Sequence, residues 1–224
     1  MVIRIFSLLI LFSPALVGCT GNRKEQKNGN TLISKTEDRS ALFDGKTLGS
    51  WEITIFGPQG PVYISGDQII LGMGDGCTGI TWKKDLPVSN YEITLEARRM
   101  EGNDFFCGMT FPVGKDPCTL IIGGWGGSVV GLSSINGMDA SENETMILKQ
   151  FEKERWYKIR LRVAADSIKS WIDDTLVVDF AIRQNILSIR PEVELSKPFG
   201  IASWRTTAAI RNIRLRSIKV KSTN

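Results

Sequence analysis

Alternation of apolar and polar residues is the dominant pattern along this chain. In Tyr91–Arg98 and again in Tyr157–Val163, every second residue is apolar and most residues between them are charged. Such a period of two gives a β-strand one apolar and one polar face. Residues 167–172 and 176–180 flank Asp173-Asp174-Thr175, a short turn-forming sequence, which predicts a β-hairpin.

Shorter apolar segments predict further strands over residues 51–55, 68–71, 105–111, 119–122, 129–132 and 200–204. Residues 211–220 form another predicted strand, with the phase slip at Ser217-Ile218 that a β-bulge causes. No window of helical length has a convincing helical period, although residues 184–189 are expected to form one turn of helix. Many short strands without crossover helices predict an all-β protein, an antiparallel β-sandwich.

The beginning of the chain has the layout of an export signal. Arg4 precedes an apolar run from Ile5 to Phe12, which is too short to cross a bilayer. Leu16-Val17-Gly18-Cys19 then resembles a bacterial lipobox, in which the cysteine is lipidated and becomes the mature N-terminus. An ordinary signal peptide cut nearby is the alternative.

This layout predicts three parts of the chain. Residues 1–18 are the expected lipoprotein signal peptide, and Cys19 is the expected site of lipidation that holds the protein at a membrane of the bacterial cell envelope. The polar residues 19–39 are expected to be a flexible tether. Residues 40–224 have the size of one domain with a substantial core.

The charge of the chain is modest. The formal net charge is +4, and it falls to +3 when residues 1–18, which contain Arg4, are removed. That charge is too small to imply a nucleic-acid partner. Basic residues do gather between Arg211 and Lys221, but they alternate with apolar residues, which favours a solvated strand face over a nucleic-acid patch.

Histidine and cysteine usage restricts the chemistry. The chain has no histidine, which excludes Ser-His-Asp, Cys-His and His-metal sites. Beyond Cys19 it has Cys77, Cys107 and Cys118, an odd number without Cys-x-x-Cys spacing, so no zinc site or disulfide framework is indicated. One disulfide among the three stays open, but a hairpin turning at Gly114-Lys115 places Cys118 opposite Phe111 rather than Cys107.

Glycine is concentrated in one stretch, in which nine of the 22 glycines fall between Gly102 and Gly137. Glycines within strand patterns mark bulges, sharp bends or close approach of a ligand to the backbone. Trp125 is the only tryptophan of this stretch and lies between pairs of glycines. We therefore expect a binding or catalytic site here.

Several motifs carry a resemblance to a known family. They are Leu42-Phe-Asp-Gly-Lys-Thr-Leu-Gly-Ser-Trp51, Tyr91–Arg98, Arg155–Arg160, Ile168–Asp173, Phe199–Trp204 and Ile210–Arg214. With them the chain resembles the bacterial 3-keto-disaccharide hydrolase domains from Ser40 to about Val220. The resemblance implies a fold similar to the concanavalin A-like jelly roll of legume lectins and laminarinase-type glucanases, which binds sugars on a concave sheet.

The same resemblance implies an activity. It predicts a hydrolase or lyase of glycosides or 3-keto-glycosides that uses carboxylates. Relatives commonly carry Asn-Ser-Gly-Ile-x-x-Arg and Tyr-Glu-x-Gln-Ile-x-Asp strands, where this chain has residues 103–110 and 119–125 without that Arg, Gln or Asp. This difference favours the alternative, a non-catalytic carbohydrate-binding module of the same fold.

Three carboxylates are the candidate catalytic residues, because glycosidic chemistry generally uses a pair of them. Glu96 is a candidate base or nucleophile, and a solvated strand face is its alternative. Asp104 begins the segment that replaces the polar strand of the relatives, and a turn-forming role is its alternative. Glu142 is the candidate second carboxylate among Asp139, Glu142 and Glu144, although a solvated acidic loop is the simpler interpretation.

Trp125 leads the candidate substrate-binding residues, because an accessible aromatic ring stacks on the apolar face of a sugar; packing in the core is its equal alternative. The complete set is Arg98, Asn103, Trp125, Asn136, Trp204 and Arg205. The expected partner is an oligosaccharide or a modified sugar. No cofactor is predicted, and a divalent cation with oxygen ligands is an option that no EF-hand spacing supports.

Overall fold

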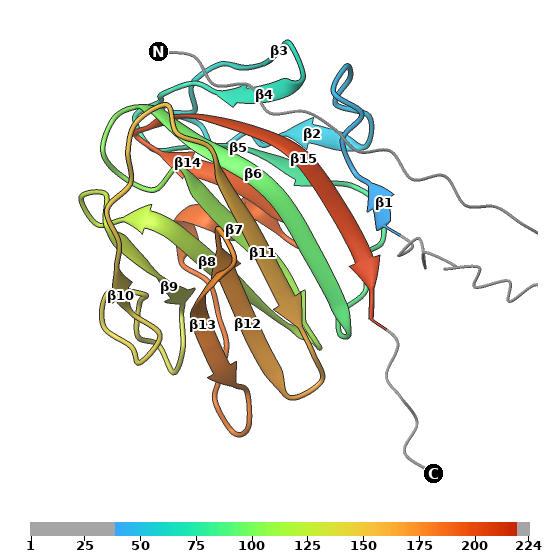
Figure 1. The fold of residues 1–224 in the computed structure, drawn as a ribbon, viewed down its shortest axis with the longest axis vertical. Coiled ribbons are helices and arrows are strands. Elements are labelled where there is room, and N and C mark those ends of the chain that lie inside the picture. The colour runs from blue at the N-terminus through green and yellow to red at the C-terminus, as the bar shows by residue number, and fades with distance from the viewer. Residues whose placement is uncertain (1–38, 219–224) are drawn as a thin grey trace, which may run out of the picture. The chain divides into compact units, whose positions relative to one another are not determined.

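Two antiparallel β-sheets face each other and form a sandwich (Figure 1). The computed structural model describes residues 39–218. The strands are β1 (Arg39–Ala41), β2 (Trp51–Ile53), β3 (Val62–Ser65), β4 (Gln68–Leu71), β5 (Cys77–Trp82), β6 (Tyr91–Glu101), β7 (Cys107–Val113), β8 (Asp116–Gly124), β9 (Val129–Ser133), β10 (Ile147–Leu148), β11 (Tyr157–Val163), β12 (Ser167–Ile172), β13 (Thr175–Ala181), β14 (Gly200–Trp204) and β15 (Thr207–Ser217). A short 3₁₀ helix, η1, spans Pro191–Ser196.

The eight-stranded sheet has the order β13-β12-β11-β6-β15-β4-β3, with β1 also paired to β15. The seven-stranded sheet has the order β10-β9-β8-β7-β14-β5-β2. Neighbours in each sheet are often far apart in sequence, as with β6 and β15, because long connections cross between the sheets. The predicted all-β antiparallel sandwich is confirmed.

The core lies between the sheets and follows from the alternation in the sequence. On β6 and β11 the apolar residues are buried, and Leu95 pairs with Ile159 across the two strands. The opposite sheet contributes Met109, Leu120 and their neighbours to the same core. At one end the hydroxyl of buried Tyr91 donates a 2.6 Å hydrogen bond to the carbonyl of Pro112, which joins the two sheets.

Both predicted hairpins form. Asp173 and Asp174 connect β12 to β13 with φ of 49° and 64°, the left-handed pair of a two-residue type I′ turn. Between β7 and β8 the chain turns at Gly114-Lys115, and Phe111 stands opposite Cys118. These two connections were predictable because the turn chemistry lies directly between the strands.

The thiols of Cys77, Cys107 and Cys118 are free and buried, so no disulfide joins them. In the β7–β8 hairpin Cys107 faces Ile122 rather than Cys118. Burial raises the pKa of each thiol to about 12, which keeps the groups protonated and unreactive near neutral pH. The three cysteines behave as small core residues.

Two local predictions are wrong. Residues 184–189 do not form a helical turn, because their backbone pairs with the segment after β9: Ser134 and Ser188 exchange hydrogen bonds of 2.7 and 3.1 Å. The bulge of the last strand is not at Ser217-Ile218. The register of β15 shifts instead between Thr207 and Ala208 and between Arg211 and Arg214, where Asn212 has φ of 54°.

Strand β5 was not predicted, because it lacks alternation. All six of its residues are buried, since one side faces the core and η1 packs on the other. Its sequence therefore shows no alternation between apolar and polar residues by which a strand with one polar face is recognised. Strand β7 is buried throughout for the same kind of reason.

The predicted signal peptide, Cys19 and nearly all of the tether over residues 19–39 lie outside the described residues. The C-terminal end of the predicted domain, residues 219–224, lies outside them as well. Within residues 39–218 no helix has the length and apolar character needed to span a bilayer.

Candidate functional site

A pocket of about 250 Å³ opens on the outer face of the seven-stranded sheet. Its floor is formed by Thr119 and Ile121 of β8 and Ser133 of β9, which alternate with core residues of the same strands. Its complete lining is Asp104, Phe105, Thr119, Ile121, Trp125, Ser133, Arg190, Glu192, Val193 and Trp204. Aromatic, hydroxyl and charged groups therefore meet in one place.

Small residues on this face let the covering segments approach the sheet. A Cβ atom on Gly108 of β7 would lie 2.9 Å from the ring of Phe105, which therefore covers β7. A Cβ atom on Gly200 of β14 would lie 2.7 Å from Ser196, so η1 rests directly on that strand. The pocket is the space left between these two covers.

Aromatic rings form one wall of the pocket. Trp125 follows the end of β8, where the register shifts between Ile122 and Gly124. Its backbone has φ of 47° and its side chain is 40% exposed, so the ring is offered to solvent rather than packed in the core. Trp204, at the end of β14, has its ring centroid 6.5 Å from that of Phe105.

Buried Arg99 anchors the loop that carries Trp125. The side chain is 5% exposed, and Nη2 donates to the carbonyl oxygens of Asp104, Gly123 and Gly127 at 3.1, 3.1 and 2.9 Å. Burial lowers the pKa of the Arg99 guanidinium from its usual value. A single cation of β6 thus joins the segment after β6 to both sides of the Trp125 loop.

Asp104 turns its carboxylate toward the same loop. One oxygen accepts a 2.7 Å hydrogen bond from the backbone N–H of Phe105, and the other accepts from the N–H of Gly126 at 3.4 Å. The backbone N–H of Asp104 donates to the hydroxyl of Thr206 at 3.1 Å. The carboxylate is therefore held in place at the pocket by backbone groups of two segments.

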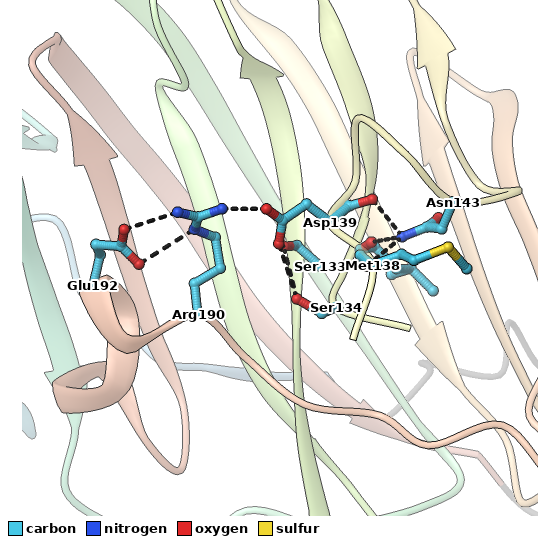
Figure 2. Close-up of polar contacts among 8 residues, drawn as sticks. Ser133, Ser134, Met138, Asp139, Asn143, Arg190 and Glu192 are labelled. Carbon is cyan, nitrogen blue, oxygen red and sulfur yellow. Dashed lines mark hydrogen bonds and ion pairs between the residues drawn. The ribbon is translucent and has the colours of Figure 1, made fainter. Parts of the chain in front are cut away.

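An ion network forms the opposite wall (Figure 2). Arg190 binds Glu192 through Nε at 3.2 Å and Nη2 at 2.9 Å, and its Nη1 pairs with the carboxylate of Asp139. Asp139 also accepts from the hydroxyls of Ser133 and Ser134 at 3.4 and 3.1 Å. The hydrogen bonds that Arg190 donates to Glu192 lower the pKa of Glu192 and raise the pKa of Arg190.

Three of the residues singled out in the sequence line this pocket: Asp104, Trp125 and Trp204. Arg205 lies beside it, with its guanidinium 5.8 Å from the ring of Trp204 and an ion pair of 2.7 Å to Asp75. Asn103 is exposed on the segment before Asp104. The glycine-rich stretch is thus the part of the sequence that the structure places at the pocket.

Four other candidates are placed elsewhere. Glu96 and Arg98 lie on the outer face of the eight-stranded sheet, where Glu96 binds Arg211 at 2.8 Å and Arg98 binds Glu154 at 2.8 Å. The core separates that face from the pocket. Glu96 and Asp104 therefore do not share a cleft, whereas the sequence analysis grouped them as candidates for one catalytic site.

Glu142 is an exposed loop residue outside the pocket lining. Asn136 joins its loop to the segment after β13, donating to Asn185 at 2.8 Å and accepting from the backbone N–H of Ile186 at 2.9 Å. Within residues 39–218 no group of three acidic, cysteine or histidine residues has the geometry to hold a metal ion.

Sequence reasoning missed Arg99, Arg190 and Glu192. Arg99 follows Arg98 at the end of an alternating strand and gives no separate signal. Arg190 and Glu192 flank Pro191 in an irregular segment, without a periodic pattern that would assign them a face. Only the path of the chain from β13 to η1 brings them over β8 and β9.

Structures with the same fold share little sequence with this chain. The carbohydrate-binding module CBM66 from Bacillus subtilis has 18% identity and a TM-score of 0.50, covering 75% of this chain and 96% of its own. The Crh5 transglycosylase has 13% identity and a TM-score of 0.56, covering 81% and 84%. The VIP36 exoplasmic/lumenal domain in its Ca²⁺/Man3GlcNAc-bound form has 12% identity and a TM-score of 0.52, covering 82% and 90%.

A comparison with curated protein sequences gives no match. A family profile described as the 3-keto-alpha-glucoside-1,2-lyase-like domain matches residues 38–216, nearly the whole of the described chain. This range includes both sheets and every residue of the pocket. The chain therefore belongs to the family of 3-keto-alpha-glucoside-1,2-lyase-like domains.

Proposed function

We propose that the pocket on the seven-stranded sheet binds a carbohydrate. The observation that carries this proposal is the pairing of two aromatic rings, exposed Trp125 and half-buried Trp204, with a polar wall that contains Asp104 and Glu192. A sugar has the same two kinds of surface: apolar C–H faces that stack on aromatic rings, and hydroxyls that donate to carboxylates.

The comparisons support this proposal. One protein of the same fold is itself a carbohydrate-binding module, and the VIP36 domain was solved with Man3GlcNAc bound. The description of the family contains the name of a sugar derivative, a 3-keto-alpha-glucoside. These proteins share the sandwich fold with this chain.

Replacing Trp125 with alanine is expected to weaken carbohydrate binding about tenfold or more, because stacking against a ring contributes about 1.5–3 kcal/mol. A glycan array identifies ligands of the full-length protein, and calorimetry compares the variants. Tyr63→Ala is the matched control, since Tyr63 is an exposed aromatic residue on β3 of the other sheet. Equal losses in both variants, or no loss in either, would refute a role for the pocket.

Catalysis is the second candidate function, and the observation that favours it is that two carboxylates, Asp104 and Glu192, line one pocket. A glutamate is ordinarily ionised near neutral pH, and the hydrogen bonds from Arg190, which lower the pKa of Glu192, keep this carboxylate in that form. An ionised carboxylate accepts a proton but cannot donate one. A reaction that begins with proton abstraction from a sugar carbon, as in a lyase, therefore suits Glu192 better than protonation of a glycosidic oxygen.

Turnover separates the two functions. If the domain is a lyase, the full-length protein releases the leaving group from 3-keto-glycosides, and Glu192→Gln reduces the rate about a hundredfold or more. Parallel assays with simple glycosides and with added divalent cations test the hydrolase and metal-dependent versions. Binding of a glycan without turnover of any of these substrates leaves the domain as a binding module.

We further propose that the protein is a lipid-anchored component of the bacterial cell envelope. The lipobox-like sequence that ends at Cys19 supports this proposal. The mass of the mature N-terminal peptide tests it, because a lipidated cysteine and an ordinary signal-peptidase product differ by the mass of the acyl chains.

A further inference from the structure

We propose that the pocket selects neutral or positively charged sugars, such as hexosides and amino sugars, and excludes sugars that carry a carboxylate. This inference rests on the proposed carbohydrate-binding function and assigns the discrimination to Asp104 and Glu192.

The charged side chains of the pocket lining are Asp104, Glu192 and Arg190. The one cation is already occupied: Arg190 makes a two-point contact with Glu192 and a further ion pair with Asp139. An incoming carboxylate would have to displace one of these partners to reach Arg190. Among the lining side chains, two carboxylates, Asp104 and Glu192, stand against the one guanidinium of Arg190, so the lining is net negative.

The carboxylates also determine which hydrogen bonds remain available. Each oxygen of Asp104 accepts one backbone N–H, and a carboxylate oxygen has a second lone-pair direction free for a ligand donor. The hydroxyl of Thr119 on the floor is hydrogen-bonded to Thr110 at 2.9 Å, and that of Ser133 contacts Asp139. The polar wall thus presents acceptors, which suit sugar hydroxyls and ammonium groups.

A negatively charged ligand meets repulsion in this environment. The aromatic rings of Trp125, Phe105 and Trp204 line one side of the pocket, and electrostatic interactions beside such an apolar wall are stronger than in bulk water. Like charges brought together at a binding site weaken the wrong complex and so provide specificity. We expect a uronic acid to bind about tenfold or more weakly than the matching neutral sugar.

A matched ligand series tests this inference on the full-length protein. The probes are the methyl glycosides of glucose and galactose, of the corresponding amino sugars and of the corresponding uronic acids. Saturation-transfer NMR and calorimetry report their affinities at low and at physiological salt. The expected order is amino sugar at least equal to neutral sugar, with the uronic acid weakest and the difference smaller at higher salt.

The variant Asp104→Asn keeps the shape of the side chain and removes its charge. It is expected to reduce the discrimination between neutral sugar and uronic acid about threefold or more. Glu52→Gln is the matched control, because Glu52 is an exposed carboxylate on β2 of the same sheet. This control is expected to leave the discrimination unchanged.

The outcomes separate the inference from the function on which it rests. A uronic acid that binds as tightly as its neutral counterpart, while the neutral sugar does bind, overturns the charge selectivity and leaves carbohydrate binding in place. Discrimination that persists undiminished in Asp104→Asn at both salt concentrations overturns the role given to Asp104. Absence of binding for every member of the series and of the glycan array overturns both.

Discussion

Replacing Glu92 with glutamine is expected to lower the free energy of unfolding by about 2–4 kcal/mol. The Glu92 side chain is only 1% exposed although it lies on the outer face of the eight-stranded sheet. Its carboxylate binds Arg162 at 2.8 and 3.1 Å and Arg216 at 2.7 Å, and Arg160 lies 3.9 Å away. Removing this charge leaves neighbouring guanidinium groups to repel one another.

The strand register explains why the effect is concentrated at one residue. Glu92 of β6 stands directly opposite Arg162 of β11 on one side and Arg216 of β15 on the other. Trp171 covers the group, since its ring lies 3.9 Å from the guanidinium of Arg160. The partners are partly solvated, which is why the expected loss is smaller than that for a wholly buried ion pair.

Chemical denaturation of the full-length protein measures this loss. Asp179→Asn is the matched control, because Asp179 forms a single exposed pair with Lys169 at 2.9 Å on the same sheet. Its expected effect is below about 1 kcal/mol. Similar losses in the two variants would show that Glu92 is no more than another surface charge.

Replacing Arg99 with methionine is expected to destabilise the protein by about 2–4 kcal/mol and to loosen the loop that carries Trp125. Methionine preserves much of the apolar stem but has no donor for the carbonyl oxygens of Asp104, Gly123 and Gly127. Each buried carbonyl left without a donor costs about 1–3 kcal/mol, reduced where the loop can move to water. Carbohydrate affinity falls with it, because the ring of Trp125 is no longer held at the pocket.

Three measurements on Arg99→Met separate these effects: denaturation, limited proteolysis at residues 123–127 and glycan affinity. The conservative variant Arg99→Lys retains a cation at the same place and is expected to recover part of the stability. A methionine variant with unchanged stability and an intact loop would show that the three hydrogen bonds have no structural role.

The sequence could indicate those parts of the site that a local feature of the chain, such as a cluster of glycines, marks directly. The glycine-rich stretch around Trp125 pointed to the pocket because other segments approach the backbone there too closely to leave room for a Cβ atom. Asp104 lay in the same stretch, and Trp204 ended a recognisable strand. These three residues were predicted candidates and do line the pocket.

The candidates that lie away from the pocket show what a local sequence pattern cannot predict. Alternation established that Glu96 and Arg98 share a polar strand face, but a period of two cannot tell whether that face lines a cleft or meets solvent. The structure puts the face on the sheet opposite the pocket. Arg190 and Glu192 had no periodicity at all, because a 3₁₀ helix and the loop before it follow neither strand nor helix spacing.

The sequence by itself determined the all-β architecture, the two hairpins and the apolar face of each alternating strand. These features follow from short-range physics: side chains point to alternate sides of a strand, and only certain residues turn the chain. Tertiary structure alone decided which polar face carries the pocket and that Arg190 reaches Asp139, 51 residues away. Such contacts depend on how distant strands order themselves within two sheets, and no local pattern of residues encodes that order.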